Sequence, residues 1–199
     1  MINSLNQQTI KWRKPIMATL VAICSVMISS CSQNLQEYEN NIPKLDLQTF
    51  FQGSLSAHGI IQDHKGQVIR MFRAELSASW QKNQGVIDEK FYFNDGKIEY
   101  RCWRIEKNGD SYIGQAGDVD GLASGQVKGN TLNWQYYLNV QTDNGERRLH
   151  LDDWLYLVDN NTLLNRTSMS FYGLEVAELT LSISKQPQMN YLQREECQL

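Results

Sequence analysis

The chain has 199 residues, with 19 Lys or Arg against 22 Asp or Glu, and a formal net charge of −3 at pH 7. This slightly acidic balance argues against a protein that binds nucleic acid or an anionic membrane surface through charge. The length allows one domain with a sizeable hydrophobic core, and no composition bias indicates a fibrous or disordered chain.

The first 30 residues differ in composition from the rest of the chain. They contain three basic residues and no acidic one, and the apolar run IMATLVAICSVMI occupies Ile16 to Ile28. A basic region, an apolar run of about 7–15 residues and small residues at its end are typical of a secretory signal. The run is shorter than the ~20 residues of a membrane-spanning helix. We predict a removable signal over 1–30, which leaves 16 basic and 22 acidic residues, a net charge of −6.

The end of this segment reads Ile28-Ser29-Ser30-Cys31. An aliphatic residue, two small residues and a cysteine resemble the lipobox of bacterial lipoproteins. The resemblance implies cleavage before Cys31, lipidation of its sulfur and acylation of the new amino terminus, and two or more acyl chains anchor a protein stably. Ser32 follows where an aspartate would, by the usual sorting rule, retain the protein in the inner membrane. We therefore expect the periplasmic leaflet of the outer membrane, with the lipid anchor as the membrane contact.

Two short segments precede the patterned part of the chain. Residues 31–43 are polar and without period, and we interpret them as a lipid-anchored tether. The stretch KLDLQTFF, Lys44 to Phe51, predicts one short helix with Asp46 near its start. We place the folded domain at residues 44–186 and a C-terminal tail at 187–199.

The folded domain alternates apolar and polar residues with period two. RMFRAELSASW, TLNWQYYLNV and AELTLSISK are examples, and turn sequences such as Asn94-Asp95-Gly96 and Lys128-Gly129-Asn130 separate such runs. The pattern predicts nine or ten strands in sequential hairpins, and a meander of that length tends to close because closure removes exposed edges. We predict an all-β fold, an antiparallel up-and-down calycin- or lipocalin-like barrel of about 8–10 strands, with an open sandwich as the alternative.

Two cysteines remain if Cys31 is acylated. They are Cys102 and Cys197, in a predicted compartment where disulfides persist. A bridge requires Cα atoms closer than about 7 Å, which the sequence does not give, so the pairing stays open. There is no CxxC motif, and the three histidines are scattered, so we expect no metal site.

The stretch HLDDWLYLVDNNTLLNR, His150 to Arg166, places Asp153 on the same strand face as four leucines. A buried carboxylate needs either partners or a proton. Arg70, in an equally apolar register, and Arg101 are candidate partners through a bidentate fork. One interpretation is a buried Asp–Arg pair that fixes strand register. The other makes the same charges the polar floor of a ligand cavity.

Six stretches together resemble a known family. They are FFQGSLSAHGIIQDHKG, DEKFYFNDGKIEYRCW, GQAGDVDG, LNWQYYL, LDDWLYLVDNNTLLNRTSMSFYG and EVAELTL, from Phe50 to about Ser184. They are similar to the DUF3833 family of proteobacterial lipoproteins, and the DDW…VD…LLNR block is the most specific part. The resemblance implies a lipocalin-like barrel in the cell envelope, and it brings no activity, substrate or catalytic residue.

The first functional hypothesis is a binding module that holds an amphiphile such as a fatty acid or a lipid fragment. Barrels of about eight strands can hold one small ligand, and inward arginines would meet a carboxylate or phosphate head group. No cofactor is expected. The candidate residues for ligand binding or a buried polar network are Arg70, Arg101, Trp103, Asp118, Asp153, Trp154, Asn165 and Arg166.

Two other hypotheses stay open. One is an envelope interaction or assembly protein whose barrel is filled, and the other is an enzyme that acts on a lipid or a small hydrophobic substrate. The chain has no G-x-S-x-G elbow, and the adjacent carboxylates of Asp152 and Asp153 would point to opposite faces of a strand. The sequence therefore leans against an enzyme. GQAGDVDG lacks the spacing of a calcium loop and is better explained as a glycine-rich turn.

Overall fold

The computed structural model describes residues 33–142, 145–189 and 191–199. The chain divides into two units, Met1–Asn34 and Leu35–Leu199, and the fold is that of the second. The predicted signal and its Cys31 lie outside the described residues. Within the described part of the chain, no helix has the length and apolar character needed to cross a membrane.

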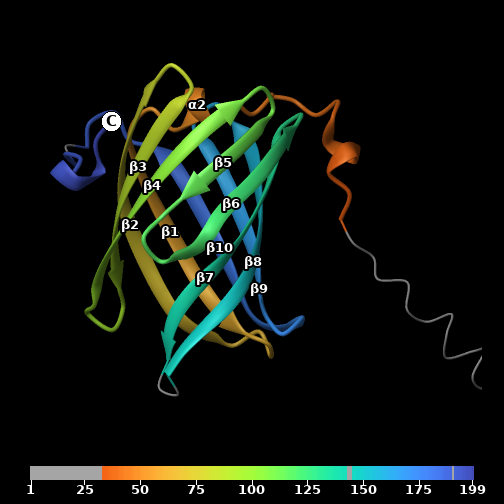
Figure 1. The fold of residues 1–199 in the computed structure, drawn as a ribbon, viewed down its shortest axis with the longest axis vertical. Helices are drawn as coiled ribbons and strands as arrows, with labels where there is room; N and C mark the ends of the chain where they lie inside the picture. The colour runs from red at the N-terminus through yellow and green to blue at the C-terminus, as the bar shows by residue number, and fades with distance from the viewer. Residues whose placement is uncertain (1–32, 143–144, 190) are drawn as a thin grey trace, which may run out of the picture. The chain divides into compact units, whose positions relative to one another are not determined.

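Ten antiparallel strands among the described residues form a closed barrel, and each pairs with its neighbours in sequence while β1 closes on β10 (Figure 1). This confirms the predicted all-β, up-and-down, lipocalin-like barrel. The strands are β1 (Gly53–Asp63), β2 (Val68–Gln81), β3 (Gln84–Phe93), β4 (Ile98–Asn108), β5 (Ser111–Gln115), β6 (Val119–Lys128), β7 (Thr131–Thr142), β8 (Gly145–Asp159), β9 (Thr162–Phe171) and β10 (Leu174–Lys185).

The strands form where the sequence alternates. In β7, Leu132, Trp134 and Tyr136 are buried while the residues between them are more exposed, because successive side chains point to opposite faces. The hairpin turns use residues that accept positive φ: Gly96, after Asn94 and Asp95, has φ 83°. Closure then pairs the two edges that an open sheet of these strands would leave exposed.

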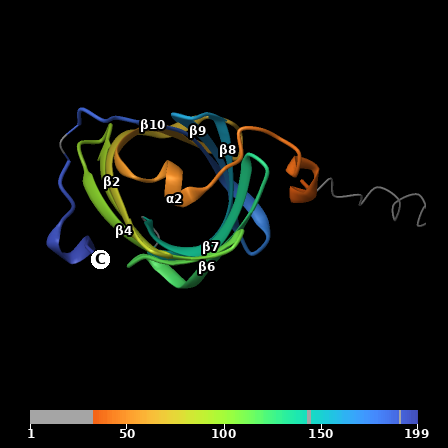
Figure 2. The ribbon, with the colours of Figure 1, turned by 90° about the horizontal axis from the view of Figure 1, so that it is seen from above.

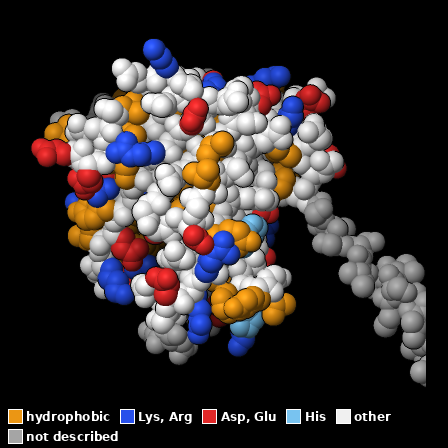
Figure 3. Space-filling view, in the orientation of Figure 1, with side chains coloured by type: hydrophobic (Ala, Val, Ile, Leu, Met, Phe, Trp, Pro, Cys, Tyr) orange, Lys and Arg blue, Asp and Glu red, His pale blue; other side chains and the backbone are white. Residues whose placement is uncertain are grey.

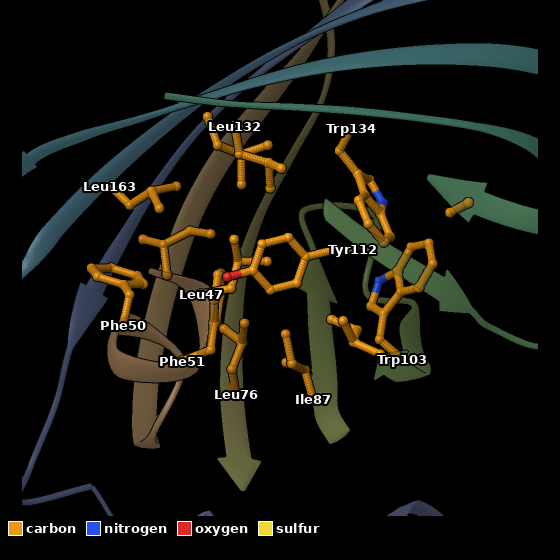
Figure 4. Close-up of a cluster of buried hydrophobic side chains, with 14 of the residues drawn as sticks. Leu47, Phe50, Phe51, Leu76, Ile87, Trp103, Tyr112, Leu132, Trp134 and Leu163 are labelled. Atoms are coloured by element: carbon orange, nitrogen blue, oxygen red, sulfur yellow. The ribbon is translucent and has the colours of Figure 1, made fainter. Parts of the chain in front are cut away.

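The predicted short helix closes one end of the barrel. It is α2 (Leu47–Phe50), and the Asp46 side chain caps it by accepting hydrogen bonds from the backbone N–H groups of Gln48 at 2.8 Å and Thr49 at 3.4 Å. Figure 2 shows α2 lying across the barrel opening. Leu47 and Phe50 are buried, and the segment therefore contributes to the core from the end (Figure 4).

The segment before α2 also packs on the barrel. The 3-10 turn η1 (Leu35–Tyr38) contacts β6 and β7, and the Tyr38 ring lies 6.1 Å from the ring of Trp154 and 5.8 Å from that of Tyr156. The backbone of Tyr38 passes directly over Gly129, where any side chain would collide with its carbonyl oxygen. Much of the segment that the sequence predicted as a tether is therefore fixed on the outer wall.

The C-terminal tail lies on the outside of the barrel (Figure 2). Cys102 of β4 and Cys197 of η2 (Glu195–Cys197) form a disulfide with their Cα atoms 5.6 Å apart, which settles the pairing that the sequence left open. Arg194 donates to the Asp88 carboxylate from Nε at 2.8 Å and from Nη2 at 2.6 Å. The Tyr191 hydroxyl also donates to Asp88, which is completely buried beneath the tail.

Candidate functional site

The interior of the barrel contains a cavity of about 120 Å³. Residues of α2 and of strands β2, β3, β4, β7, β8, β9 and β10 line it, so it lies within the closed wall. A larger hollow of about 560 Å³ lies near the β7–β8 and β9–β10 turns, where Arg147, His150 and Phe171 contribute to it. None of the described residues that line this hollow is buried. The interior cavity is therefore the better candidate for a specific site.

Aromatic rings form one side of the cavity. The ring of Trp103 lies 5.7 Å from that of Trp134 and 5.3 Å from that of Tyr136, both in edge-to-face geometry. The indole of Trp134 packs against two glycines, Gly114 of β5 and Gly125 of β6. A Cβ at Gly114 would lie 2.5 Å from the indole, and a Cβ at Gly125 would overlap it. Figure 4 shows the two indoles beside the apolar cluster.

The polar part of the cavity lining includes two charged side chains, Glu89 of β3 and Arg101 of β4. Glu89 and Arg101 are directly paired positions of the two strands. Arg101 nevertheless binds Asp118, which follows β5, through Nε at 2.9 Å and Nη2 at 2.7 Å. This bidentate contact neutralises the arginine. Glu89 remains beside it without an ion-pair contact within 4 Å among the described residues.

Asp153 is the second interior carboxyl, and only 7% of it is exposed. It lies opposite Trp134 on β7 and Thr167 on β9, and hydrogen bonds from the hydroxyls of Thr167 and Tyr136 stabilise its charged form. Asn165 in turn donates from Nδ2 to the Thr167 hydroxyl at 3.3 Å. No arginine contacts Asp153 within 4 Å in the described chain, so the two hydroxyls are the neutral groups that favour its charge.

Three buried oxygen atoms of the cavity lining have no hydrogen-bond partner among the described residues. They are Oε2 of Glu89, Oδ1 of Asp153 and Oδ1 of Asn165. Each is an acceptor, and they come from three different strands. A buried acceptor without a partner destabilises a fold by about 1–3 kcal/mol, so three of them around one cavity point to a site that receives donors from a ligand or from water.

Burial changes the protonation of these groups. It raises the pKa of Glu89 to about 7, against the opposing effect of the Arg101 charge. Burial likewise raises the pKa of Asp153 to about 7, against the opposing hydrogen bond from Thr167 and the charge of Arg101. The pKa of the Tyr136 hydroxyl also lies well above its usual value, first because of burial and then because of the Asp153 charge. Near neutral pH each of the two carboxyls is therefore only partly ionised.

Arg70 does not partner Asp153. It lies in the inward register of β2, but near the end of the barrel at which β3 turns into β4, and it contacts Glu99 at 2.9 Å and Asp95 at 3.5 Å. Its guanidinium also stacks 3.2 Å from the centre of the Phe93 ring. The predicted Arg70–Asp153 pair is wrong because alternation fixes the face of a residue and not its depth along the barrel.

Trp154 and Arg166 lie on the outer wall, since each is next to an inward residue of its strand. Trp154 donates to the Asp152 carboxylate at 3.3 Å, and Arg166 donates to Glu178 at 2.6 Å. They are corrections to the predicted cavity set. The structure brings together five of the predicted residues around the cavity: Arg101, Trp103, Asp118, Asp153 and Asn165.

Sequence reasoning missed Glu89 and Thr167. The segment Ile87, Glu89 and Phe91 alternates, and all three side chains line the cavity, so the same face argument that found Asp153 would have found Glu89. Thr167 is fully buried, but a threonine in a strand carries no signal that separates a polar network from ordinary β-propensity.

The arginines of the sequence hypothesis are already paired. Arg70, Arg101 and Arg166 each contact a carboxylate of the chain, so the arrangement does not fit the expected carboxylate or phosphate head group. No cluster of three potential metal ligands occurs among the described residues. On the face of the molecule seen in Figure 3, acidic and basic side chains are interspersed.

A closed up-and-down barrel around a small, partly polar cavity is the architecture of the lipocalin- and calycin-like proteins. More specifically, the chain belongs to the DUF3833 family, a family described as proteins of unknown function, whose model matches residues 25–185. The predicted family is therefore confirmed, and membership assigns no activity.

Solved structures share the fold. An S-type phycobiliprotein lyase from Guillardia theta matches with a TM-score of 0.52 and 5% identity over 77% of this chain and 96% of that one. A protein of unknown function of the DUF3598 family from Nostoc punctiforme matches with a TM-score of 0.52 and 10% identity, over 73% of this chain and 51% of that one. At such identities the likeness is one of fold alone. The comparison with curated proteins finds no match.

Proposed function

We propose that this protein is a binding module that holds a small amphiphilic molecule inside its barrel. The observation that carries the proposal is the interior cavity, which is lined both by aromatic rings and by three buried oxygens that have no hydrogen-bond partner among the described residues. A barrel whose interior serves only as a core would pair such groups or replace them by apolar side chains.

The size of the cavity limits what it holds. A volume of about 120 Å³ is close to that of an engineered protein cavity of about 150 Å³ that accepts benzene. The site therefore suits a group of roughly six heavy atoms, such as a short alkyl chain with a polar end. A long acyl chain would have to extend beyond it, because pockets for drug-sized ligands are about 300–1,000 Å³.

The binding test uses the full chain in phosphatidylcholine nanodiscs. Isothermal titration calorimetry with 1-hexanol, corrected for empty nanodiscs, is expected to give saturable one-to-one binding. Leu179→Trp introduces an indole into the cavity lining and should abolish it. Leu164→Trp makes the same change at an exposed position of β9 and should leave binding intact.

The outcome that contradicts the proposal is equally direct. If neither 1-hexanol nor any other straight-chain alkyl ligand of four to eight carbons saturates the chain, the interior is a core and the alternative of an envelope interaction or assembly protein gains support. Binding that Leu179→Trp and Leu164→Trp leave equally strong would place the ligand outside the barrel.

We further propose that lipid on Cys31 anchors the module to the periplasmic leaflet of an outer membrane. The lipobox-like sequence before Cys31 supports this, and so does the Cys102–Cys197 disulfide, because disulfides persist outside the reducing cytosol. We expect Cys31→Ser to lose incorporation of labelled palmitate and to shift the protein from the membrane to the soluble or unprocessed fraction. Cys24→Ser is the control, and incorporation that survives Cys31→Ser would contradict the anchor.

A further inference from the structure

The cavity presents hydrogen-bond acceptors to whatever enters it. Oε2 of Glu89, Oδ1 of Asp153 and Oδ1 of Asn165 all belong to lining residues and have no partner among the described residues. Asp153 and Asn165 are each only 7% exposed, so these atoms face the interior. A ligand that satisfies them must bring donors, and the desolvation cost of leaving them bare gives selectivity against ligands that bring none.

The charge of the cavity is acidic. Its one arginine, Arg101, is held by the two-pronged contact with Asp118, and the carboxyls of Glu89 and Asp153 remain. An anionic head group would therefore face two carboxyls of like charge. A neutral hydroxyl avoids that repulsion but donates only one hydrogen bond.

A primary ammonium fits both properties. It carries three N–H donors and no acceptor, which matches three unpartnered acceptor oxygens. It is also cationic, and the faces of the lining rings of Trp103, Trp134 and Tyr136 attract cations. Resting on the proposed function, we propose that the ligand of this cavity is a primary alkylamine, bound through its ammonium group to Glu89, Asp153 and Asn165.

The pH dependence of this recognition follows from the groups around it. The charged and titratable groups that act on the two carboxyls are Asp88 of β3, Arg101 of β4, Asp118 after β5, Tyr136 of β7 and Asp152 of β8, and the charge of Asp153 also raises the pKa of Glu89 by repulsion. Because burial raises the pKa of Glu89 and Asp153 to about 7, both carry their negative charge above that pH and lose it below. Amine binding should therefore weaken by at least about tenfold between about pH 8.5 and about pH 5.5.

The experiment compares three ligands with the same six-carbon chain: n-hexylamine, 1-hexanol and hexanoate. Each is titrated calorimetrically into the full chain in phosphatidylcholine nanodiscs at about pH 8.5. We expect n-hexylamine to bind at least about tenfold more tightly than 1-hexanol, and hexanoate not to bind. The alkylamine keeps its charge throughout the range because an amine of this kind has a pKa near that of lysine, about 10.4.

Two substitutions remove one charge each with almost no change of shape. Glu89→Gln and Asp153→Asn should each weaken n-hexylamine binding at least about tenfold and so reduce its advantage over 1-hexanol. Glu89→Gln keeps the test valid if Asp153→Asn fails to fold. Glu178→Gln is the matched control, because Glu178 pairs with Arg166 on the outer wall.

Failure of this inference is distinct from failure of the proposed function. If 1-hexanol binds and n-hexylamine binds no better, the cavity is a site for neutral amphiphiles and the ammonium assignment is wrong. Tight binding of hexanoate would also overturn the assignment. If none of the three ligands saturates the protein, the proposed function itself fails.

The same ammonium chemistry occurs in free amines and in ethanolamine head groups of lipids. Replacing part of the phosphatidylcholine by phosphatidylethanolamine in the nanodiscs separates these sources. A lowered apparent affinity for n-hexylamine would identify the head group as a competitor and support the ammonium site. Unchanged affinity supports a soluble amine as the ligand, provided that n-hexylamine still binds more tightly than 1-hexanol and hexanoate does not bind.

Discussion

Asp153 lies inside the barrel without an ion-pair partner within 4 Å among the described residues. The hydroxyls of Thr167 and Tyr136 stabilise its charged form, and Arg101, whose charge also acts on it, is already bound by Asp118. Replacing a buried ion pair by apolar residues is often neutral or stabilising, so even a pair would be weak evidence that these charges stabilise the fold. Glu89 and Asp153 each keep an oxygen without a hydrogen-bond partner among the described residues, although Arg101 is paired with Asp118. Stability alone does not explain this arrangement.

These carboxyls should make the stability of the protein fall as pH rises. Unfolded, Asp153 and Glu89 have ordinary pKa values of 3.8 and 4.5, whereas folding raises both to about 7. Between these limits the folded state binds more protons than the unfolded state, so each group lowers the free energy of unfolding by about 1.4 kcal/mol per pH unit as pH rises. Below the two ordinary pKa values and above about pH 7.5, these groups no longer change the free energy of unfolding with pH.

Urea unfolding at about pH 5, 6, 7 and 8 measures this slope. Asp153→Asn should flatten it, because an amide does not titrate, while Asp120→Asn at an exposed position should not. A free energy of unfolding that rises over this interval in the unsubstituted protein would contradict the raised pKa values.

Residue-level prediction from the sequence succeeded for faces and failed for partners. Alternation placed Asp153 on the face that lines the cavity, whereas Trp103 and Asn165, which also line it, were named without an argument about their face. It could not show that Arg70 lies near an end, because the relative depth of two strands depends on the pairing register. Trp154 and Arg166 were chosen from a distinctive block of sequence, although the alternation itself placed them outside.

At the scale of strands, glycines of β5 and β6 make room for an indole. Gly125→Ala would press a methyl group against Trp134 and bring it to 2.7 Å from the backbone oxygen of Asn133, which cannot easily move. We expect a loss of about 1–3 kcal/mol in the free energy of unfolding, measured by chemical denaturation. Gly117→Ala is the control, since nothing lies within 4 Å of its added carbon. Equal stability of the two variants would contradict the packing argument.

The C-terminal tail is a second element whose contacts can be tested. Asp88 is completely buried, and the Arg194 guanidinium donates two hydrogen bonds to it while the Arg194 backbone N–H donates a third. Arg194→Met keeps most of the side chain but removes its hydrogen bonds to the Asp88 carboxylate. We expect the free energy of unfolding to fall by about 3 kcal/mol. Arg166→Met removes an exposed ion pair with Glu178 and should cost less than about 1 kcal/mol. Thermal or urea unfolding that ranks the two variants in the opposite order would refute the role of the tail.

Sequence patterns predicted where helices and strands form better than where the short helix and the tail pack. Asn-Asp-Gly and similar turn sequences predicted the hairpins, and Asp46 predicted the start of α2. That α2 would lie across the barrel opening could not be read from four residues, because the position of a short helix depends on where the closed wall leaves apolar side chains uncovered. The tail likewise has no periodic pattern, and its place follows from single contacts such as the one to Asp88.

For the whole molecule, the disulfide joins residues 95 positions apart in the sequence. Closing a loop of that length restricts the unfolded chain, and we expect the double variant Cys102→Ser, Cys197→Ser to lose about 4 kcal/mol of stability. The barrel closes through β1 and β10, which the bridge does not link, so binding of 1-hexanol should survive. Differential scanning calorimetry and the titration described above test both statements, and loss of binding with an intact fold would contradict the second.

The packing of η1 bears on the lipid anchor that we propose at Cys31. Leu35 begins the turn that rests on β6 and β7, and Cys31 precedes it by four residues. Even a fully extended chain covers only about 3.5 Å per residue, so a lipidated Cys31 would keep the attachment point within about 14 Å of its acyl chains. A bilayer has head-group layers several ångströms thick on each side of its hydrocarbon. A protein held so closely would meet solutes at the lipid–water boundary, before they disperse into the open aqueous space.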